Sequence, residues 1–225
     1  MSTAQAQQPQ AVSLLGKPLV PPSLSGDDRK AADADLVRAR AAYDADPGSA
    51  DAMLALARAT ARTGRIAEAL EMYTRGIEVH PDDGRMFLER GRYYIVIRKF
   101  DVALRDFKKA AETQKQARCE AGIASYLKAE FATARDALQS CTNQPWPYLA
   151  ALRAGGAKGP APASSDAMVS AYVSAAQQLA AGHTDQARDG LKKIVEKNGD
   201  AWMEPVYIAA ESDYARVRRH PSRRR

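Results

Sequence analysis

Large and small apolar residues recur along this chain at a fixed step of 34 positions. Residues 63–70 read TGRIAEAL and residues 97–104 read IRKFDVAL, with Ala69 and Ala103 at corresponding places. The same step relates the remaining pairs, which are Met53 and Phe87, Ala57 and Gly91, Tyr73 and Phe107, Gly76 and Ala110, and Pro47 and Pro81. A repeat of about this length is typical of stacked helical hairpins. The pattern therefore predicts an all-α fold, and it favours a binding module over an enzyme.

Turn residues between the apolar stretches predict about ten or eleven helices and no strands. A first helix over about 28–45 ends at Asp46-Pro47-Gly48, since proline cannot continue a helix. Three hairpins follow, the third of them degenerate, and then come a short helix, a fourth hairpin and a last helix that covers the open end. These helices span about 50–62, 66–79, 84–97, 100–113, 116–128, 131–141, 147–153, 166–181, 184–197 and 200–217.

Segments of biased composition mark the boundaries of the helical array. Residues 1–27 are rich in Gln, Pro and Ser, which predicts an extended or disordered arm. Residues 155–165, GGAKGPAPASS, predict a flexible linker. We therefore expect the array over 28–154, a C-terminal hairpin with its capping helix over 166–215, and a basic tail over 216–225.

The repeated residues resemble the tetratricopeptide repeat family, whose pattern is W-x2-L-G-x2-Y, then A-x3-F, then P. Arg90 departs from this pattern, because it stands where leucine is usual. The matching residues are Met53, Leu56, Ala57, Thr60, Ala69, Tyr73 and Pro81 in the first repeat, and Phe87, Gly91, Tyr94, Ala103 and Phe107 in the second. The resemblance implies a right-handed α-α superhelix, or solenoid, in which small residues let paired helices approach closely.

Members of this family mostly bind peptides or proteins in a concave groove lined by the first helix of each hairpin. By that resemblance the groove of this chain comprises Arg58, Arg62, Arg85, Leu88, Arg92, Ile95, Ile123 and Tyr126. Its four arginines favour an acidic protein or peptide, because a guanidinium donates two parallel hydrogen bonds to a carboxylate. The competing interpretation is that these arginines only keep the helix surface soluble.

One subclass of the family is not expected. Members that clamp the acidic C-terminus of heat-shock chaperones use Lys and Asn at set places on the first helices. This chain has Leu54, Arg58, Glu89, Gln116 and Glu120 at those places. The resemblance therefore implies a non-catalytic scaffold without the chaperone clamp.

The net charge of +6 comes from the C-terminal tail, because residues 216–225 hold six arginines and no acid. An alternative function is therefore binding of nucleic acid or an anionic surface through this tail. The tail lacks the aromatic residues that stack on bases, so nucleic acid is the less favoured partner. No residues show the spacing of a metal site, a catalytic pair or a phosphate loop, so we expect neither an enzyme nor a cofactor. The sequence specifies neither the partner's identity nor the oligomeric state.

The two cysteines bear on the compartment. Cys119 lies early in the third hairpin and Cys141 ends it, and these ends are neighbours in an antiparallel hairpin, so a disulfide is within reach. A disulfide would indicate an oxidising compartment, and Ala4-Gln5-Ala6 resembles the end of a cleaved secretory signal. Together they would indicate an exported protein of the periplasm or bacterial cell envelope. The alternative is two reduced cysteines in a cytoplasmic protein. No run of about 18 apolar residues is present, so no transmembrane helix is expected.

Overall fold

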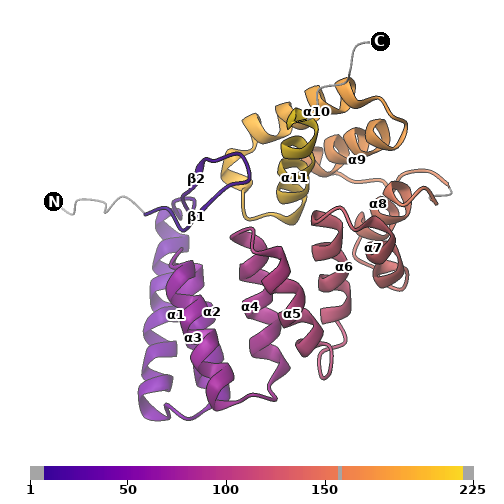
Figure 1. The fold of residues 1–225 in the computed structure, drawn as a ribbon. Coiled ribbons are helices and arrows are strands. Elements are labelled where there is room, and N and C mark those ends of the chain that lie inside the picture. Colours follow the sequence, from indigo (N-terminus) through magenta and orange to yellow (C-terminus); the bar gives the residue numbers. More distant parts are fainter. Residues whose placement is uncertain (1–7, 157–158, 220–225) are drawn as a thin grey trace. The chain divides into compact units, whose positions relative to one another are not determined.

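The computed structural model describes residues 8–156 and 159–219 (Figure 1). Within them lie eleven α-helices, one short 3-10 helix and two short strands. The helices are α1 Gly26–Ala45, α2 Ala50–Arg62, α3 Ile66–Val79, α4 Gly84–Val96, α5 Phe100–Ala110, α6 Ala117–Leu127, α7 Phe131–Leu138, α8 Trp146–Arg153, α9 Ala167–Ala180, α10 Thr184–Lys197 and α11 Pro205–Arg219, with the 3-10 helix at Gly199–Ala201. The all-α helical-repeat fold is confirmed, while the right-handed superhelical winding stays a prediction.

The prediction that the chain has no strands is wrong for the N-terminal segment. Strands β1 (Ala11–Val12) and β2 (Pro18–Leu19) pair in antiparallel fashion. The turn between them forms because Gly16 adopts a φ of 83° and the Ser13 hydroxyl accepts the backbone N–H groups of residues 15 and 17. The segment expected to be an arm thus contains a hairpin with Leu19 buried. Ala4-Gln5-Ala6 lies outside the described residues.

The turns inside the four hairpins share one backbone conformation. Gly64, Arg98, Ala129 and Gly182 each lie between the two helices of a hairpin, and their φ angles are 84°, 64°, 66° and 79°. Glycine adopts this left-handed region freely, whereas a side chain makes it unfavourable by about 1 kcal/mol. The turn between α2 and α3 is therefore the one that its sequence, Thr63-Gly64-Arg65, specifies most directly.

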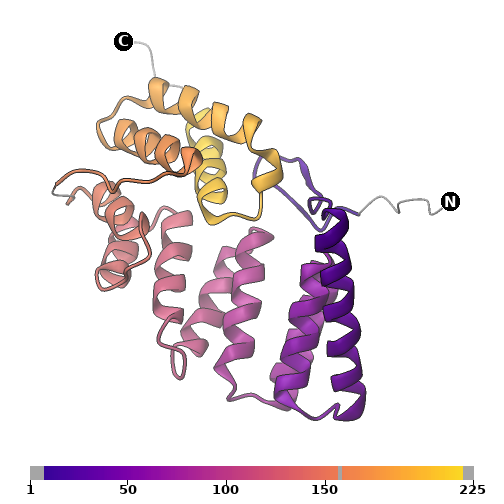
Figure 2. The ribbon, with the colours of Figure 1, turned by 180° about the vertical axis from the view of Figure 1, so that it is seen from behind.

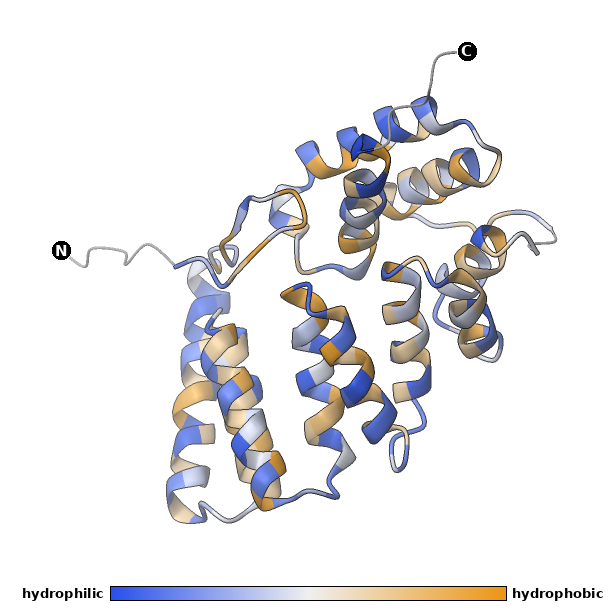
Figure 3. Ribbon diagram, in the orientation of Figure 1, coloured by the Kyte–Doolittle hydropathy of each residue, from blue (hydrophilic) through white to orange (hydrophobic). Residues whose placement is uncertain are grey.

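Helix starts follow the expected capping chemistry. The side chains of Ser25, Ser49, Asp83 and Asp166 precede α1, α2, α4 and α9, and each accepts a backbone N–H of the first turn. The helices are amphipathic, and Figure 3 shows apolar and polar residues alternating around them. No helix among the described residues has the length and apolar character needed to cross a bilayer.

The described residues divide into two compact units. The first contains the chain up to Arg98 together with Arg105–Ala117, and the second contains Lys99–Leu104 and the residues from Arg118 onward. Helix α5 thus begins in the second unit and ends in the first. In the first unit α1 packs against α2, and α2 packs against α3, as Figures 1 and 2 both show.

The core of the first unit explains the repeated small positions. Ala57 on α2 and Ala69 on α3 are fully buried where those helices meet. A Cβ atom added to Gly91 on α4 would lie 2.6 Å from Cε1 of Phe107 on α5, so only glycine fits there without a shift. Close helix contact at these positions is the physical reason for the 34-residue repeat of small residues.

The second unit is built from α6 to α11 and the first turn of α5. Helix α8 packs against both α7 and α9, and α10 packs against α9 and α11. The linker predicted at 155–165 connects α8 to α9 within this unit, and the division into a separate array and C-terminal hairpin stays a prediction. The fully buried large side chains here are Tyr126, Leu127, Leu138, Leu149, Tyr172, Leu191, Ile208 and Glu211.

Candidate functional site

The arginines predicted to line a groove lie on α2 and α4, where the structure pairs each with a carboxylate of the same chain. Glu89 stands between two of them: its Oε1 atom lies 2.7 Å from Nη2 of Arg58 and 3.3 Å from Nη1 of Arg92. The Glu89 side chain is only 13% exposed, whereas those of Arg58 and Arg92 are 50% and 41% exposed. These three residues, called here the Glu89 cluster, hold two positive charges and one negative charge.

Arg85 is paired on both sides. Its guanidinium lies 2.6 Å from Asp51 of α2 and 2.7 Å from Asp83, the residue that caps α4. Hydrogen bonds from Arg85 lower the pKa of the Asp83 carboxyl, and the bonds to Asp83 and Asp51 raise the pKa of Arg85. Because two carboxylates neutralise this arginine, Arg85 is the least suited of the four to bind a further acid.

Arg62 belongs to a groove between α1 and α2. It forms an ion pair with Asp35 of α1, which also pairs with Arg38. The groove has a volume of about 500 Å³ and is lined by Asp35, Arg38, Ala39, Ala42, Ala55, Arg58, Ala59 and Arg62. Three guanidinium groups and one carboxylate thus surround a floor of four alanines. This surface, called here the α1–α2 groove, contains two of the arginines that the sequence predicted.

Two tyrosines lie near the Glu89 cluster. The rings of Tyr73 on α3 and Tyr93 on α4 are stacked with their centroids 6.0 Å apart. Tyr73 is fully buried, and its hydroxyl has no hydrogen-bond partner among the described residues. Burial raises the pKa of both phenols, and the negative charge of Glu89 raises them further. Both hydroxyls therefore stay protonated beneath the charged surface.

The apolar residues predicted for the groove contribute to the core. Leu88, Ile95, Ile123 and Tyr126 are each less than 9% exposed. The Tyr126 hydroxyl lies 3.0 Å from the Tyr172 hydroxyl inside the second unit. Because these side chains are buried, the arginines are the accessible part of the predicted set.

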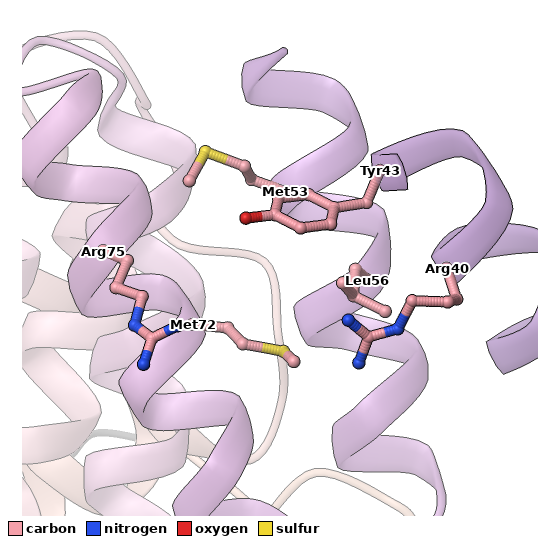
Figure 4. A pocket seen from close by; sticks show the side chains of 6 residues that line it. All are labelled: Arg40, Tyr43, Met53, Leu56, Met72 and Arg75. Atoms are coloured by element: carbon pink, nitrogen blue, oxygen red, sulfur yellow. The ribbon is translucent and has the colours of Figure 1, made fainter. Parts of the chain in front are cut away.

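A pocket that the sequence did not indicate lies between α1, α2 and α3 of the first unit. Arg40 and Tyr43 of α1, Met53 and Leu56 of α2, and Met72 and Arg75 of α3 line a cavity of about 60 Å³ (Figure 4). Its residues come from three helices and follow no repeat position shared between them, so only the folded chain assembles it. We call it the Arg40–Arg75 pocket.

Cys119 and Cys141 form a disulfide in the structure, with their Cα atoms 6.0 Å apart. Cys119 lies in the first turn of α6, and Cys141 follows the end of α7. The bond joins the two open ends of this hairpin. No group of three or more His, Cys, Asp or Glu side chains is placed to hold a metal ion within residues 8–156 and 159–219.

The basic tail is in part a structural element. Helix α11 continues to Arg219, and Arg216 donates hydrogen bonds to Asp213 and to the backbone carbonyl of Leu127. Arg216 therefore holds α11 in the second unit, and residues 216–219, which the sequence assigned to the tail, belong to this helix. Residues 220–225 lie outside the described part of the chain.

Comparison with known families agrees with the repeat pattern. Residues 27–88, which span α1 to the first turns of α4, match a family model described as tetratricopeptide repeat. No curated protein matches the chain. The tetratricopeptide resemblance is therefore confirmed for this segment, and repeats of this kind are generally protein-interaction scaffolds.

Proposed function

We propose that this protein is a non-catalytic scaffold that binds an acidic segment of a partner protein in the α1–α2 groove. The observation that carries the proposal is the groove's lining, in which Arg38 and Arg62 share one carboxylate, Asp35, while Arg58 pairs with Glu89 of α4. Three guanidinium groups thus meet two carboxylates, and the excess of positive charge makes an acidic segment the complementary ligand.

The geometry of the groove suits a polypeptide. Its volume of about 500 Å³ is within the range of about 300–1,000 Å³ that is usual for binding clefts. The alanine floor leaves space for a main chain to approach closely, because the methyl groups are short. The walls supply guanidinium groups that donate several hydrogen bonds each, which fits the carboxylates of aspartate or glutamate side chains.

The existing ion pairs do not prevent this binding. The Arg58 and Arg62 side chains are 50% and 54% exposed, and ion pairs of such exposed groups contribute only about 0–1 kcal/mol each. A ligand carboxylate can therefore add to these pairs or replace them at small cost. The Glu89 cluster extends the positive surface from Arg58 to Arg92 on α4.

The test is affinity capture from an extract of the source cells, with three forms of the full chain. The first is the unchanged protein, and the second carries Arg58→Glu and Arg62→Glu. The third carries Arg105→Glu and Arg118→Glu, a control with the same change of charge at two other exposed arginines. Partners lost by the groove variant and retained by the control support the proposal. Equal capture by all three forms contradicts it.

Binding through the tail is tested separately by truncation. The chain should be cut after Arg219, because a cut before Arg216 removes the bonds of that residue to Asp213 and Leu127. Capture through the groove survives this truncation. Capture that is lost on truncation and falls steeply with salt indicates the tail instead, since counterion release governs such binding.

A further inference from the structure

The Arg40–Arg75 pocket is distinct from the α1–α2 groove but adjoins it. The two share no lining residue. Leu56 of the pocket and Ala59 of the groove lie in one buried cluster with Ala39, so the two surfaces lie over the same contact between α1 and α2.

The floor of the pocket is apolar and adaptable. Leu56 and Met53 are 2% and 8% exposed, and Met72 lies partly buried between α2 and α3. The Thr60 hydroxyl lies 3.5 Å from the Met72 sulfur and holds that side chain in place by a weak hydrogen bond. Two thioethers beside a leucine make a surface that adjusts to the shape of an aliphatic group.

The size of the cavity selects the kind of ligand. A volume of about 60 Å³ is well below the roughly 300 Å³ at which small-molecule sites begin. It accepts the end of one aliphatic side chain rather than a cofactor. The occupant is therefore a residue of a polypeptide, with the rest of the chain lying across the rim.

The rim carries two arginines that are not held in ion pairs. Arg40 and Arg75 form no ion pair with any residue in the described ranges, in contrast to the four arginines on α2 and α4 that the sequence singled out. Arg75 also borders a second surface pocket, where Glu71 and Glu78 of α3 lie beside it. Figure 4 shows their guanidinium groups on opposite sides of the pocket, with Met72 between them and the Tyr43 ring lying across it. None of the lining residues is acidic, so acceptors must come from the ligand.

We propose that the Arg40–Arg75 pocket binds a segment of a partner protein in which one aliphatic residue lies between acidic residues. The aliphatic side chain enters the cavity against Leu56 and Met72. The flanking carboxylates accept hydrogen bonds from Arg40 on one side and Arg75 on the other. This contact is separate from the proposed function of the groove, and either site can fail without the other.

The experiment uses the methionines of the pocket as probes. The full chain is labelled with ¹³C in its methionine methyl groups and titrated with a short synthetic peptide that has one leucine between acidic residues. We expect the signals of Met53 and Met72 to shift, and that of Met168 on α9 to stay unchanged. Replacing the leucine by serine, or the acids by their amides, should weaken binding at least about tenfold, because each removes one of the two recognised groups.

Two matched variants locate the binding site. Arg40→Glu with Arg75→Glu should weaken binding of the peptide at least about tenfold. Arg58→Glu with Arg62→Glu should leave the shifts of the Met53 and Met72 signals on titration unchanged. Both arginines of the pocket are exposed, so the fold tolerates their replacement. The proposal is overturned if neither methionine responds, or if the pocket variant binds as the unchanged protein does. It is also overturned if the two signals shift with protein concentration alone, since the occupant is then a second copy of this chain.

Discussion

Each unit of this protein contains a carboxylate that stands between two arginines, and the two sites differ in burial. In the first unit the Glu89 side chain is 13% exposed, and those of its partners Arg58 and Arg92 are 50% and 41% exposed. In the second unit the Asp213 side chain is 1% exposed, and those of its partners Arg153 and Arg216, each at 2.7 Å, are 13% and 35% exposed. The comparison teaches that burial, and not the pattern of charges, decides whether such a group supports the fold or stays available to a ligand.

The Asp213 site is held by an aromatic contact and a tyrosine hydrogen bond in addition to its ion pairs. The Tyr172 hydroxyl donates to the carboxylate at 2.9 Å, and the guanidinium of Arg153 lies 4.2 Å from the centre of the Phe131 ring. Burial and the negative charge of Asp213 raise the pKa of Tyr172 well above its ordinary value. The carboxylate thus joins α8, α9 and α11, and its loss leaves two cations without their partner.

The largest effect is expected for Asp213→Asn. Removing one partner of a buried ion pair destabilises a protein by about 3–5 kcal/mol, because the remaining charge stays buried and uncompensated. Urea unfolding followed by circular dichroism measures the change in the free energy of unfolding. A loss of less than about 1 kcal/mol would place this site in the same class as an exposed pair and remove the distinction between the units.

The disulfide is expected to have the next largest effect. It closes a loop of 22 residues in the second unit, which corresponds to about 3 kcal/mol of chain entropy in the unfolded state. Cys119→Ser with Cys141→Ser should lower the stability by about this amount, and a reductant should do the same to the unchanged protein. Two titratable thiols in the denatured, unreduced protein would show that the bond is absent in solution.

The helices of the fold follow from local sequence, whereas the site does not. The 34-residue step locates Ala57, Gly91 and Phe107 at helix contacts because each repeat buries the same positions. One ion pair follows from the same step, since Asp51 and Arg85 are 34 residues apart and contact each other. Equivalent positions of adjacent repeats are neighbours, which is a signal that sequence reasoning could have used.

Other features depend on contacts that no repeat encodes. Arg153 and Asp213 are separated by 60 residues, and Tyr172 and Asp213 by 41. The Arg40–Arg75 pocket forms only where three helices meet. The hairpin of β1 and β2 was missed because each strand has two residues, too few for an alternating pattern of apolar and polar positions to show.

A smaller effect is expected at the start of α4. Asp83 caps this helix and pairs with Arg85, so Asp83→Ala should lower the stability by about 1 kcal/mol at neutral pH. The pKa of Asp83 is lowered in the folded state, so its contribution is present above the pKa of the unfolded chain, near 4. It is lost as the pH falls through the folded pKa.

Unfolding of the unchanged protein and of this variant at pH 7 and in strong acid measures that dependence. The difference between them should shrink in acid. Asp83→Asn is the matched control, because an asparagine keeps the cap and loses the charge. A difference between unchanged protein and Asp83→Ala that is independent of pH would show that the charge of Asp83 contributes nothing.

The smallest effect on stability is expected for Glu89→Gln, the counterpart of the change at Asp213. The pairs of Glu89 involve exposed arginines, so the free energy of unfolding should change by less than about 1 kcal/mol. The pKa of Tyr93 should fall, since the charge of Glu89 helps to raise it, and NMR titration of labelled tyrosine measures this. The change also removes the ion-pair partner of Arg58, which lines the adjoining α1–α2 groove, so binding of an acidic partner there should become tighter. A loss of stability as large as that of Asp213→Asn would instead make Glu89 a structural residue. The arginines that it contacts on α2 and α4 would then stabilise the fold and would not be available to bind a ligand.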